Sequence, residues 1–514
     1  MAKKAAFHNL GCKVNAYETE AMAEQLKRDG YEIVPFDVGA DVYVINTCTV
    51  TNIADRKSRQ MLRRAREMNP HAIVVAAGCY VEDSELDVKK DPIADIAVGN
   101  NEKSRLAELL RQYYRGLSGE ERERYEPGAA VLTDKAGLPD DSEGKEKDHG
   151  ASASLADKAD LTGAGKGKET GAGRQTPPVN RRENINRVTS YDNLRISEAG
   201  EHTRAYIKIQ DGCNQFCSYC MIPYVRGRVR SREKEDILQE ARRLAEGGYR
   251  ELVLTGIHIS SYGLDFDYPG QNRQTPDAAE AETNVRLLEL IKEAASVPGV
   301  ERIRLGSLEP GIMTEDFVRS IADIPEICPQ FHLSLQSGSN TVLERMRRKY
   351  RTDDYEAICK RIREAFSHPA ITTDIITGFP GETAEESEET VRFAERIKFA
   401  KTHIFKYSAR RGTKAAAMKE QIPESVKHAR SAVLIELDRK NRREFADYYV
   451  SKELEVLFEE KKLFRGAMQW FGHTREALDV YLMGASEKKL SGSLVRCRVL
   501  RSVEDGSLLA EPVI

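Results

Sequence analysis

The chain has 514 residues, too many for one ordinary domain, and this length predicts about three domains. Its net charge of −3 singles out no class of partner. No apolar run approaches the ~20 residues of a membrane span, and the N-terminus lacks the apolar core of a signal peptide. We therefore expect a cytoplasmic protein, in which nine cysteines indicate metal binding or catalysis rather than disulfides.

Residues 1–115 alternate between predicted strands and predicted helices. The apolar runs at 42–45 and 72–77 are typical of buried parallel strands, whereas 18–28 and 55–68 have helical patterns. We expect an open parallel α/β domain, with helices on both faces of its sheet.

Three cysteines of this domain each follow a predicted strand. They are Cys12, Cys48 and Cys79, called the N-terminal triad below. The carboxyl ends of parallel strands share one sheet edge, where ligands bind, so we expect the three thiols to meet there and to hold an iron–sulfur cluster. Ordinary buried cysteines fit the pattern equally well. A flavin site is another alternative, although no glycine-rich phosphate loop accompanies it.

Residues 116–190 form a predicted linker. The sequence contains no Phe, Trp or Tyr between Tyr125 and Tyr191 and is rich in small and charged residues. Such a composition cannot bury enough apolar surface to offset the entropy of the chain. We expect most of 134–183 to be a disordered insert, to which the sequence assigns no role.

Residues 191–422 contain six predicted strand–helix units. The predicted strands are 205–210, 251–257, 302–307, 331–337, 371–377 and 402–408, and the predicted helices are 233–247, 284–297, 314–323, 353–366 and 384–399. This order predicts a partial (β/α)6 barrel with its active residues at the carboxyl ends of the strands.

A second group of cysteines follows the first strand of this barrel. Cys213, Cys217 and Cys220, called the barrel triad below, have the spacing C-x3-C-x2-C. Three thiolates this close favour a 4Fe–4S cluster with one iron free for a ligand. A structural zinc site is the alternative, but such sites usually have four protein ligands, and no fourth cysteine or histidine lies nearby in sequence.

The two triads carry a resemblance to a known family. C-x3-C-x-aromatic-C, with Tyr219 as the aromatic residue, resembles the signature of the radical S-adenosylmethionine enzymes. Segments 10–15, 46–51 and 78–80 resemble the N-terminal domain of the methylthiotransferases in that superfamily. The resemblance implies two 4Fe–4S clusters, an auxiliary one on the N-terminal triad and one on the barrel triad that chelates S-adenosylmethionine. One S-adenosylmethionine would methylate cluster-held sulfur, and a second would be cleaved to a 5′-deoxyadenosyl radical.

Further segments at the predicted strand ends resemble the same family. On this basis we expect six residues to lie on the S-adenosylmethionine side: Tyr219, Thr255, Gly256, Ser307, Glu309 and Gln336. Loop geometry or a hydrogen bond at a strand end is the alternative role for each single residue. Cys328 and Cys359 match no cluster motif and are expected to be packing residues.

The C-terminal part is predicted to be one helix, 423–448, followed by a small antiparallel β-barrel at 449–514. Alternating apolar residues mark predicted strands at 454–458, 478–482 and 494–500. The barrel resembles the TRAM domain, an OB-like RNA-binding module of this family, with 470–474 in a loop. Because the segment has ten basic and ten acidic residues, RNA binding would need a local basic face, and a simple solvated barrel is the alternative.

Two basic clusters flank the triads. Their members are Arg56, Lys57, Arg59, Arg63, Arg64 and Arg66 on the helix after Cys48, and Arg226, Arg228, Arg230 and Arg232 after the barrel triad. We expect both clusters to lie near the mouth between the domains, where positive surfaces favour a phosphate backbone. Solvated charged faces are the alternative.

The resemblance implies a radical methylthiotransferase that acts on the anticodon loop of tRNA and receives electrons from a donor such as flavodoxin or ferredoxin. Segment 10–20 most resembles the subgroup that modifies carbon 2 of N6-threonylcarbamoyladenosine next to the anticodon. After the first cysteine, the isopentenyladenosine subgroup tends to have Gln-Met, and the subgroup that modifies a ribosomal-protein aspartate has Pro-Lys. Those two substrates are the alternatives within the family. A zinc-containing RNA-binding protein without catalysis is the alternative outside it.

Overall fold

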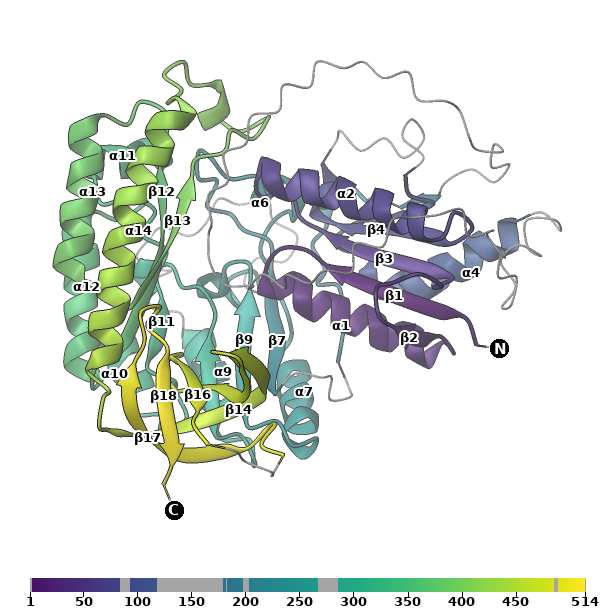
Figure 1. Ribbon diagram of the computed structural model, residues 1–514. Helices are drawn as coiled ribbons and strands as arrows, with labels where there is room; N and C mark the ends of the chain where they lie inside the picture. The colour runs from purple at the N-terminus through teal and green to yellow at the C-terminus, as the bar shows by residue number, and fades with distance from the viewer. Residues whose placement is uncertain are drawn as a thin grey trace.

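The computed structural model describes residues 2–83, 93–117, 179–181, 183–196, 203–266, 285–484 and 489–513. Most of the predicted insert at 134–183 lies outside these residues. Figure 1 shows a parallel sheet with its helices beside a central set of strands and helices, and a small C-terminal barrel below the central strands. The predicted α/β fold class is confirmed.

The N-terminal sheet has six parallel strands in the order β2-β1-β3-β4-β5-β6. The strands are β1 Lys4–Asn9, β2 Glu32–Val34, β3 Val42–Thr47, β4 Ile73–Gly78, β5 Ile96–Val98 and β6 Val179–Arg181. The helical segments are α1 Lys13–Arg28, α2 Asn52–Met68, α3 Cys79–Glu82, η1 Lys103–Arg105 and α4 Leu106–Gly116. Every residue of β3 and β4 is buried, as expected for central strands covered on both faces.

The central unit contains six parallel strands, as predicted, and one short antiparallel strand. The strands are β7 Arg204–Asp211, β8 Arg230–Ser231, β9 Glu251–Gly256, β10 Arg302–Leu305, β11 Gln330–His332, β12 Ala370–Thr377 and β13 Lys401–Lys406. They form two hydrogen-bonded sheets, β10-β9-β7-β8 and β11-β12-β13. Parallel bridges between Ile303 and Ile327 and between Leu308 and Leu333 join these sheets into one partial barrel.

The central unit also contains α-helices and short 3-10 helices. They are η2 Ile185–Arg187, α6 Ile222–Val225, α7 Lys234–Glu246, η3 Ile259–Ser261, α9 Val285–Ala295, η4 Pro310–Ile312, α10 Glu315–Ala322, α11 Asn340–Met346, α12 Thr352–Ala365, α13 Ala384–Ile397 and η5 Ala415–Ala417. The five predicted helices are present at nearly the predicted bounds. The sequence pattern missed α11, because seven residues give too little helical periodicity.

The long helix α14 Glu424–Asp447 packs against β13 and leads into a closed five-stranded barrel. The barrel strands are β14 Glu453–Phe464, β15 Ala467–His473, β16 Asp479–Leu482, β17 Leu494–Ser502 and β18 Leu508–Pro512. The expectation that 470–474 forms a loop is wrong for most of its residues. Trp470 and Phe471 are buried within β15, and Gly472 lies so close to β14 that an added Cβ would meet the Leu457 oxygen at 2.3 Å. Among the helices described, none has the length and apolarity needed to span a membrane.

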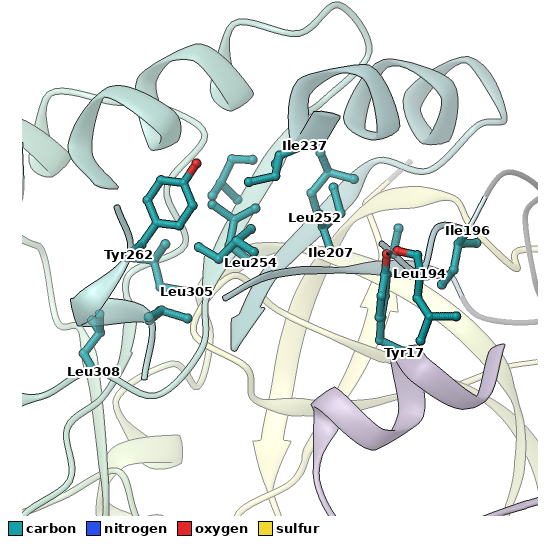
Figure 2. Close-up of a cluster of buried hydrophobic side chains, with 14 of the residues drawn as sticks. Tyr17, Leu194, Ile196, Ile207, Ile237, Leu252, Leu254, Tyr262, Leu305 and Leu308 are labelled. Atoms are coloured by element: carbon teal, nitrogen blue, oxygen red, sulfur yellow. Dashed lines mark hydrogen bonds between the residues drawn. The ribbon is translucent and has the colours of Figure 1, made fainter. Parts of the chain in front are cut away.

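One hydrophobic core continues from the N-terminal sheet into the central unit. Figure 2 shows the junction, where Tyr17 of α1 lies beside Leu194 and Ile196, close to the barrel residues Ile207 and Leu252. The Tyr17 hydroxyl also donates a hydrogen bond to the Leu194 oxygen at 2.9 Å. Because packed interiors are stiff, this shared core holds the two units together as one body.

Candidate active site

The barrel triad lies in the loop after β7, at the carboxyl end of the first barrel strand. A tight turn shapes this loop. Gly212 has φ +72°, and a Cβ added there would lie 1.8 Å from the Arg228 oxygen. The Cys213 N–H donates to the Gly227 oxygen at 3.0 Å, which ties the start of the loop to its end. Only glycine fits at position 212, because the two arms of the loop touch there.

The three thiols of the barrel triad lie close enough to influence one another. Burial first, and the neighbouring Cys217 second, raise the pKa of Cys220 to about 12 and also raise the pKa of Cys213. The backbone N–H groups of Gln215 and Ile222 point at the sulfurs of Cys213 and Cys220, at 3.5 and 3.4 Å. N–H donors of this kind stabilise the negative sulfur of an iron–sulfur cluster.

Arg348 links the barrel triad to one of the predicted cofactor residues. Its Nη1 donates to the Cys217 sulfur at 3.2 Å, and its Nη2 contacts both carboxylate oxygens of Glu309 at 3.0 and 2.7 Å. Burial alone would raise the pKa of Glu309, but Arg348 and His258 lower it, so Glu309 is ionised. The sequence analysis missed Arg348, because it stands 131 residues after Cys217 and belongs to no motif.

The N-terminal triad lies where the topology of the sheet predicts it. Cys48 and Cys79 directly follow β3 and β4, and Cys12 comes three residues after the end of β1; the three strands are adjacent in the sheet. Burial first, and Cys79 second, raise the pKa of Cys48 to about 12, and Cys12 also contributes. A Cβ added at Gly11 would lie 2.9 Å from the Cys48 Cβ, so this glycine permits the close approach of two cysteine loops. The structure thus brings the three thiols together.

The spacing of both triads argues against zinc. Tetrahedral zinc at a Zn–S distance of ~2.3 Å places its sulfur ligands about 3.8 Å apart. Among the described residues, which include all nine cysteines, no cysteine joins a group of three ligand atoms within 4.8 Å of one another. A 4Fe–4S cluster is larger, and each of its thiolates binds a different iron. The residues present therefore fit a cluster better than a single zinc ion.

The two triads share one buried interface. Asn100 donates to the Cys79 sulfur at 3.6 Å and to the Val225 oxygen of α6 at 2.7 Å. On the other side, Arg226 donates to the Asn15 Oδ1 at 2.6 Å, and this oxygen lies 3.9 Å from the Cys12 sulfur. Residues that touch the N-terminal triad therefore also hold the loop that follows the barrel triad.

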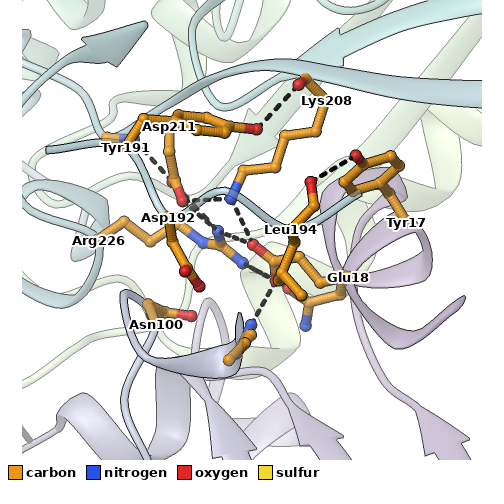
Figure 3. Close-up of polar contacts among 12 residues, drawn as sticks. Tyr17, Glu18, Asn100, Tyr191, Asp192, Leu194, Lys208, Asp211 and Arg226 are labelled. Atoms are coloured by element: carbon orange, nitrogen blue, oxygen red, sulfur yellow. Dashed lines mark hydrogen bonds and ion pairs between the residues drawn. The ribbon is translucent and has the colours of Figure 1, made fainter. Parts of the chain in front are cut away.

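A network of buried charges crosses this interface. Figure 3 shows Lys208 and Arg226 pointing toward Glu18 of α1 and Asp211 of β7. Glu18 accepts hydrogen bonds from Arg226 at 2.9 Å and Lys208 at 2.7 Å, and pairs with Lys103. Asp211 accepts from Lys208 at 2.6 Å and Arg226 at 3.1 Å. All five side chains are at most 3% exposed.

The network keeps both of its carboxylates ionised. Burial alone would raise the pKa of Glu18, but Arg226, Lys103 and Lys208 hold this pKa well below its usual range. Burial opposes ionisation of Asp211 in the same way, and Lys208 and Arg226 lower its pKa. Three cations against two carboxylates leave one positive charge in this group of five, and Arg226 brings it close to Cys12, where it favours anionic sulfur.

Replacing Glu18 by Gln is expected to destabilise the protein by about 3–5 kcal/mol, because three buried cations would lose a shared counter-ion. The midpoint of urea unfolding, followed by circular dichroism, measures this loss. Glu395→Gln is the matched control, since Glu395 is exposed on α13. A Glu18→Gln protein as stable as the control would show that the network contributes little.

The structure corrects the expected role of the second basic cluster. Arg226, Arg230 and Arg232 are at most 1% exposed and cannot reach an RNA phosphate. Buried carboxylates pair with them, as Glu18 of α1 does with Arg226 and Glu240 of α7 does with Arg232. Arg228 is half-buried, with its guanidinium 4.4 Å from the centre of the Phe216 ring.

The first basic cluster does face solvent. Arg56, Lys57, Arg63 and Arg64 are exposed along α2, and Arg59 is half-buried. Arg66 instead pairs with Asp95 at 2.8 Å. Thr51 caps the start of α2 by accepting from the Ala54 N–H, so this basic face begins directly after the Cys48 loop.

A cavity of about 620 Å³, called the inner cavity below, lies inside the partial barrel. Its walls come from the start of α1, the inner faces of the barrel strands, and the C-terminal barrel. Three predicted cofactor residues, Thr255, Gly256 and Ser307, line it together with Cys12. An added Cβ at Gly256 would lie 2.9 Å from the Ile259 side chain, so the β9 end is closely packed.

The other predicted cofactor residues are placed differently. Glu309 lines a separate cavity of about 400 Å³ with His258. Gln336 has φ +71° in the segment between β11 and α11, and Tyr219 packs edge-on against Phe379 with ring centres 6.5 Å apart. The structure therefore gathers three of the six residues on one cavity and leaves the role of each a prediction.

The inner cavity also holds polar residues that the sequence analysis did not single out. His332, Asp374 and His403 come from the adjacent strands β11, β12 and β13, and their ligand atoms lie within 4.8 Å of one another. Lys13 lines the same cavity. No sequence motif marks these positions as neighbours.

Two family models match the chain. The model of the radical SAM superfamily matches residues 207–394, which contain the barrel triad. The model described as uncharacterized protein family UPF0004 matches residues 4–99, which contain the N-terminal triad.

Relatives with similar sequences extend over nearly the whole chain. The chain is 35% identical over 500 residues to threonylcarbamoyladenosine tRNA methylthiotransferase MtaB of Bacillus subtilis strain 168, covering 97% of this chain and 94% of the relative. The MtaB protein of Aquifex aeolicus is 36% identical over 461 residues, covering 90% and 94%. The tRNA-2-methylthio-N(6)-dimethylallyladenosine synthase of Clostridium tetani is 31% identical over 455 residues, covering 87% and 84%.

Among solved structures, the radical S-adenosylmethionine methyltransferase TsrM from Kitasatospora setae has a similar fold. It aligns with a TM-score of 0.51 at 16% identity, covering 81% of this chain and 77% of that chain. At this identity the similarity concerns the fold alone.

Proposed function

Because this chain belongs to the radical S-adenosylmethionine methylthiotransferases, with threonylcarbamoyladenosine tRNA methylthiotransferases among its relatives, we propose that it attaches a methylthio group to carbon 2 of N6-threonylcarbamoyladenosine in tRNA. It is an enzyme whose cofactors are S-adenosylmethionine and 4Fe–4S clusters. The observation that carries the proposal is the pair of cysteine triads at the carboxyl ends of two parallel sheets that share one buried interface.

In this proposal each triad has its own cluster. Cys213, Cys217 and Cys220 would hold the cluster that binds S-adenosylmethionine, and Cys12, Cys48 and Cys79 the auxiliary cluster. When bound, these groups supply the methylthio group and the 5′-deoxyadenosyl radical that removes hydrogen from carbon 2. Tyr219, Thr255, Gly256, Ser307, Glu309 and Gln336 are proposed for the cofactor side.

The polypeptide contributes electrostatics and position. Arg348 and the amides of Gln215 and Ile222 stabilise negative charge on the barrel-triad sulfurs. The ion pair with Glu309 in turn fixes the orientation of Arg348. The shared core at α1 and the network around Glu18 would then keep the two clusters at a constant separation.

We propose that the exposed basic face of α2 holds the phosphates of the anticodon stem. Arg56, Lys57, Arg63 and Arg64 supply charge next to the Cys48 loop. Phosphate contacts of this kind weaken as salt concentration rises. The C-terminal barrel, which resembles a TRAM domain, borders the inner cavity through His473 and Asp479 and is the second proposed RNA contact. A flavodoxin or ferredoxin donor remains a prediction from the resemblance, and a cytoplasmic location remains a prediction from the sequence.

A strain that lacks this gene is expected to accumulate N6-threonylcarbamoyladenosine and to lose its 2-methylthio derivative, because the enzyme that attaches the methylthio group would be missing. Mass spectrometry of tRNA nucleosides measures both. A complemented strain is the control. Retention of the derivative, with loss of methylthio-isopentenyladenosine or of the ribosomal-protein modification, would reassign the substrate while leaving the radical chemistry intact.

A further inference from the structure

Charged residues of both signs line the inner cavity. Its lining contains five Lys or Arg residues, namely Lys13, Arg204, Arg304, Lys401 and Arg442, and three Asp or Glu residues, namely Asp374, Glu476 and Asp479. Two of the cations are neutralised by carboxylates behind the cavity wall. Arg204 pairs with Glu459 at 2.7 Å, and Arg304 pairs with Glu251 at 2.7 Å. The three remaining cations, Lys13, Lys401 and Arg442, equal the carboxylates of the lining in number, so the pairing of each cation, and not the net charge, determines what the cavity can bind.

Among these remaining cations, Lys13 is the one next to a cysteine of the N-terminal triad. It directly follows Cys12, and both residues line the cavity. Within the described residues, its ammonium group has no hydrogen-bond or ion-pair partner. An ammonium group on a cavity wall that has no partner is available to an anionic ligand.

The proposed substrate carries an anion of suitable chemistry. The threonylcarbamoyl group on N6 ends in a carboxylate, which an ammonium group recognises through charge-assisted hydrogen bonds. In adenine, carbon 2 and the carbon that bears N6 are both bonded to ring nitrogen 1, so the N6 substituent and carbon 2 share one edge of the base. A carboxylate held beside Cys12 would therefore bring this edge toward the N-terminal triad.

We propose that Lys13 binds the carboxylate of the threonylcarbamoyl group and selects this substrate over adenosines with an uncharged N6 substituent. The inference rests on the proposed function and adds to it a residue that determines specificity. Lys401 of β13, whose ammonium group also has no ion pair within the described chain, supplies further positive potential. The binding energy comes from a permanent charge on the ligand, so a neutral substrate of equal size would gain nothing from Lys13.

The test uses the full-length protein with both clusters assembled anaerobically. Two anticodon stem-loop RNAs are compared, one with N6-threonylcarbamoyladenosine and one in which a carboxamide replaces the carboxylate. Lys13→Gln is expected to raise the Kd for the carboxylate RNA about 10- to 100-fold, the usual range for losing a hydrogen bond to a charged group. For the carboxamide RNA, the Lys13→Gln variant and the unsubstituted protein should have the same Kd. Lys13→Arg should recover part of the preference.

Lys292→Gln is the matched control, because Lys292 is exposed on α9, away from the cavity, and it should leave both Kd values unchanged. The carboxamide RNA also reports whether Lys13→Gln is folded. Equal weakening of both RNAs would make Lys13 a phosphate contact, and weaker binding of S-adenosylmethionine would make it a cofactor contact; either result overturns the inference. If the unsubstituted protein does not prefer the carboxylate RNA, the proposed substrate fails. If it does and Lys13→Gln keeps that preference, only the role of Lys13 fails.

Discussion

Replacing Cys213, Cys217 and Cys220 together by Ala is expected to abolish formation of 5′-deoxyadenosine and to remove about half of the iron. The reason is local. These thiols are gathered by one tight loop after β7, with N–H donors directed at two of the sulfurs. No other cysteine lies in that loop to replace them. Chromatography of the reaction products and iron analysis of anaerobically assembled protein measure the two outcomes.

The matched control replaces the three cysteines that belong to neither triad. Cys328, Cys359 and Cys497 are buried, and the last two lie within hydrophobic clusters, so their triple Ala variant should keep its iron and its cleavage of S-adenosylmethionine. If the barrel-triad variant still produced 5′-deoxyadenosine, the assignment of that cluster would be wrong. Zinc in place of iron and sulfide in the unsubstituted protein would favour the non-catalytic alternative.

The triple Ala variant of Cys12, Cys48 and Cys79 should separate cleavage from transfer. We expect some 5′-deoxyadenosine, because the barrel triad remains, and a complete loss of methylthiolated product, because the auxiliary cluster has lost its ligands. Liquid chromatography with mass spectrometry detects both compounds in one reaction. Circular dichroism would show that the N-terminal sheet is intact, since its core residues are unchanged.

Two outcomes would contradict this separation. Full product from the N-terminal-triad variant would exclude an auxiliary cluster at this sheet edge. If the variant formed neither 5′-deoxyadenosine nor methylthiolated product, the two cluster sites would not be independent. That second result has a physical route in the structure. Asn100 contacts both Cys79 and the Val225 oxygen, and Arg226 contacts Asn15, whose side-chain oxygen lies beside the Cys12 sulfur.

Placement of the two triads on one interface also explains why the charges there are buried. Glu18 comes from α1, Asp211 from β7 and Lys103 from the turn before α4, so the network joins three separate elements. Buried ion pairs contribute little net stability, yet removing one partner is costly. The network therefore fixes the two sheets in one relative position. Two clusters that take part in the same reaction would need such a fixed position.

The sequence by itself determined the class of fold and the chemistry. Hydrophobic runs of strand length alternating with helical patterns predicted the parallel sheet and the six barrel strands, because both depend on local periodicity. Chain order alone also predicted that Cys12, Cys48 and Cys79 would meet, since the carboxyl ends of parallel strands share one edge. Short strands such as β6 and β18 escaped prediction, because pairing with distant partners rather than their own pattern makes them strands.

Only the tertiary structure decided which charged residues serve packing and which remain available. Arg56 and Arg226 look alike in sequence, each in a basic cluster beside a cysteine triad, yet one is exposed and the other is fully buried against Glu18. The partner that decides the matter stands 208 residues away in the chain. The roles of Arg348 and Lys13 likewise depend on neighbours in space. The charges around a residue come from all of its neighbours in space. Sequence periodicity predicts the strands and helices that carry those neighbours, but it does not predict which of these elements contact one another.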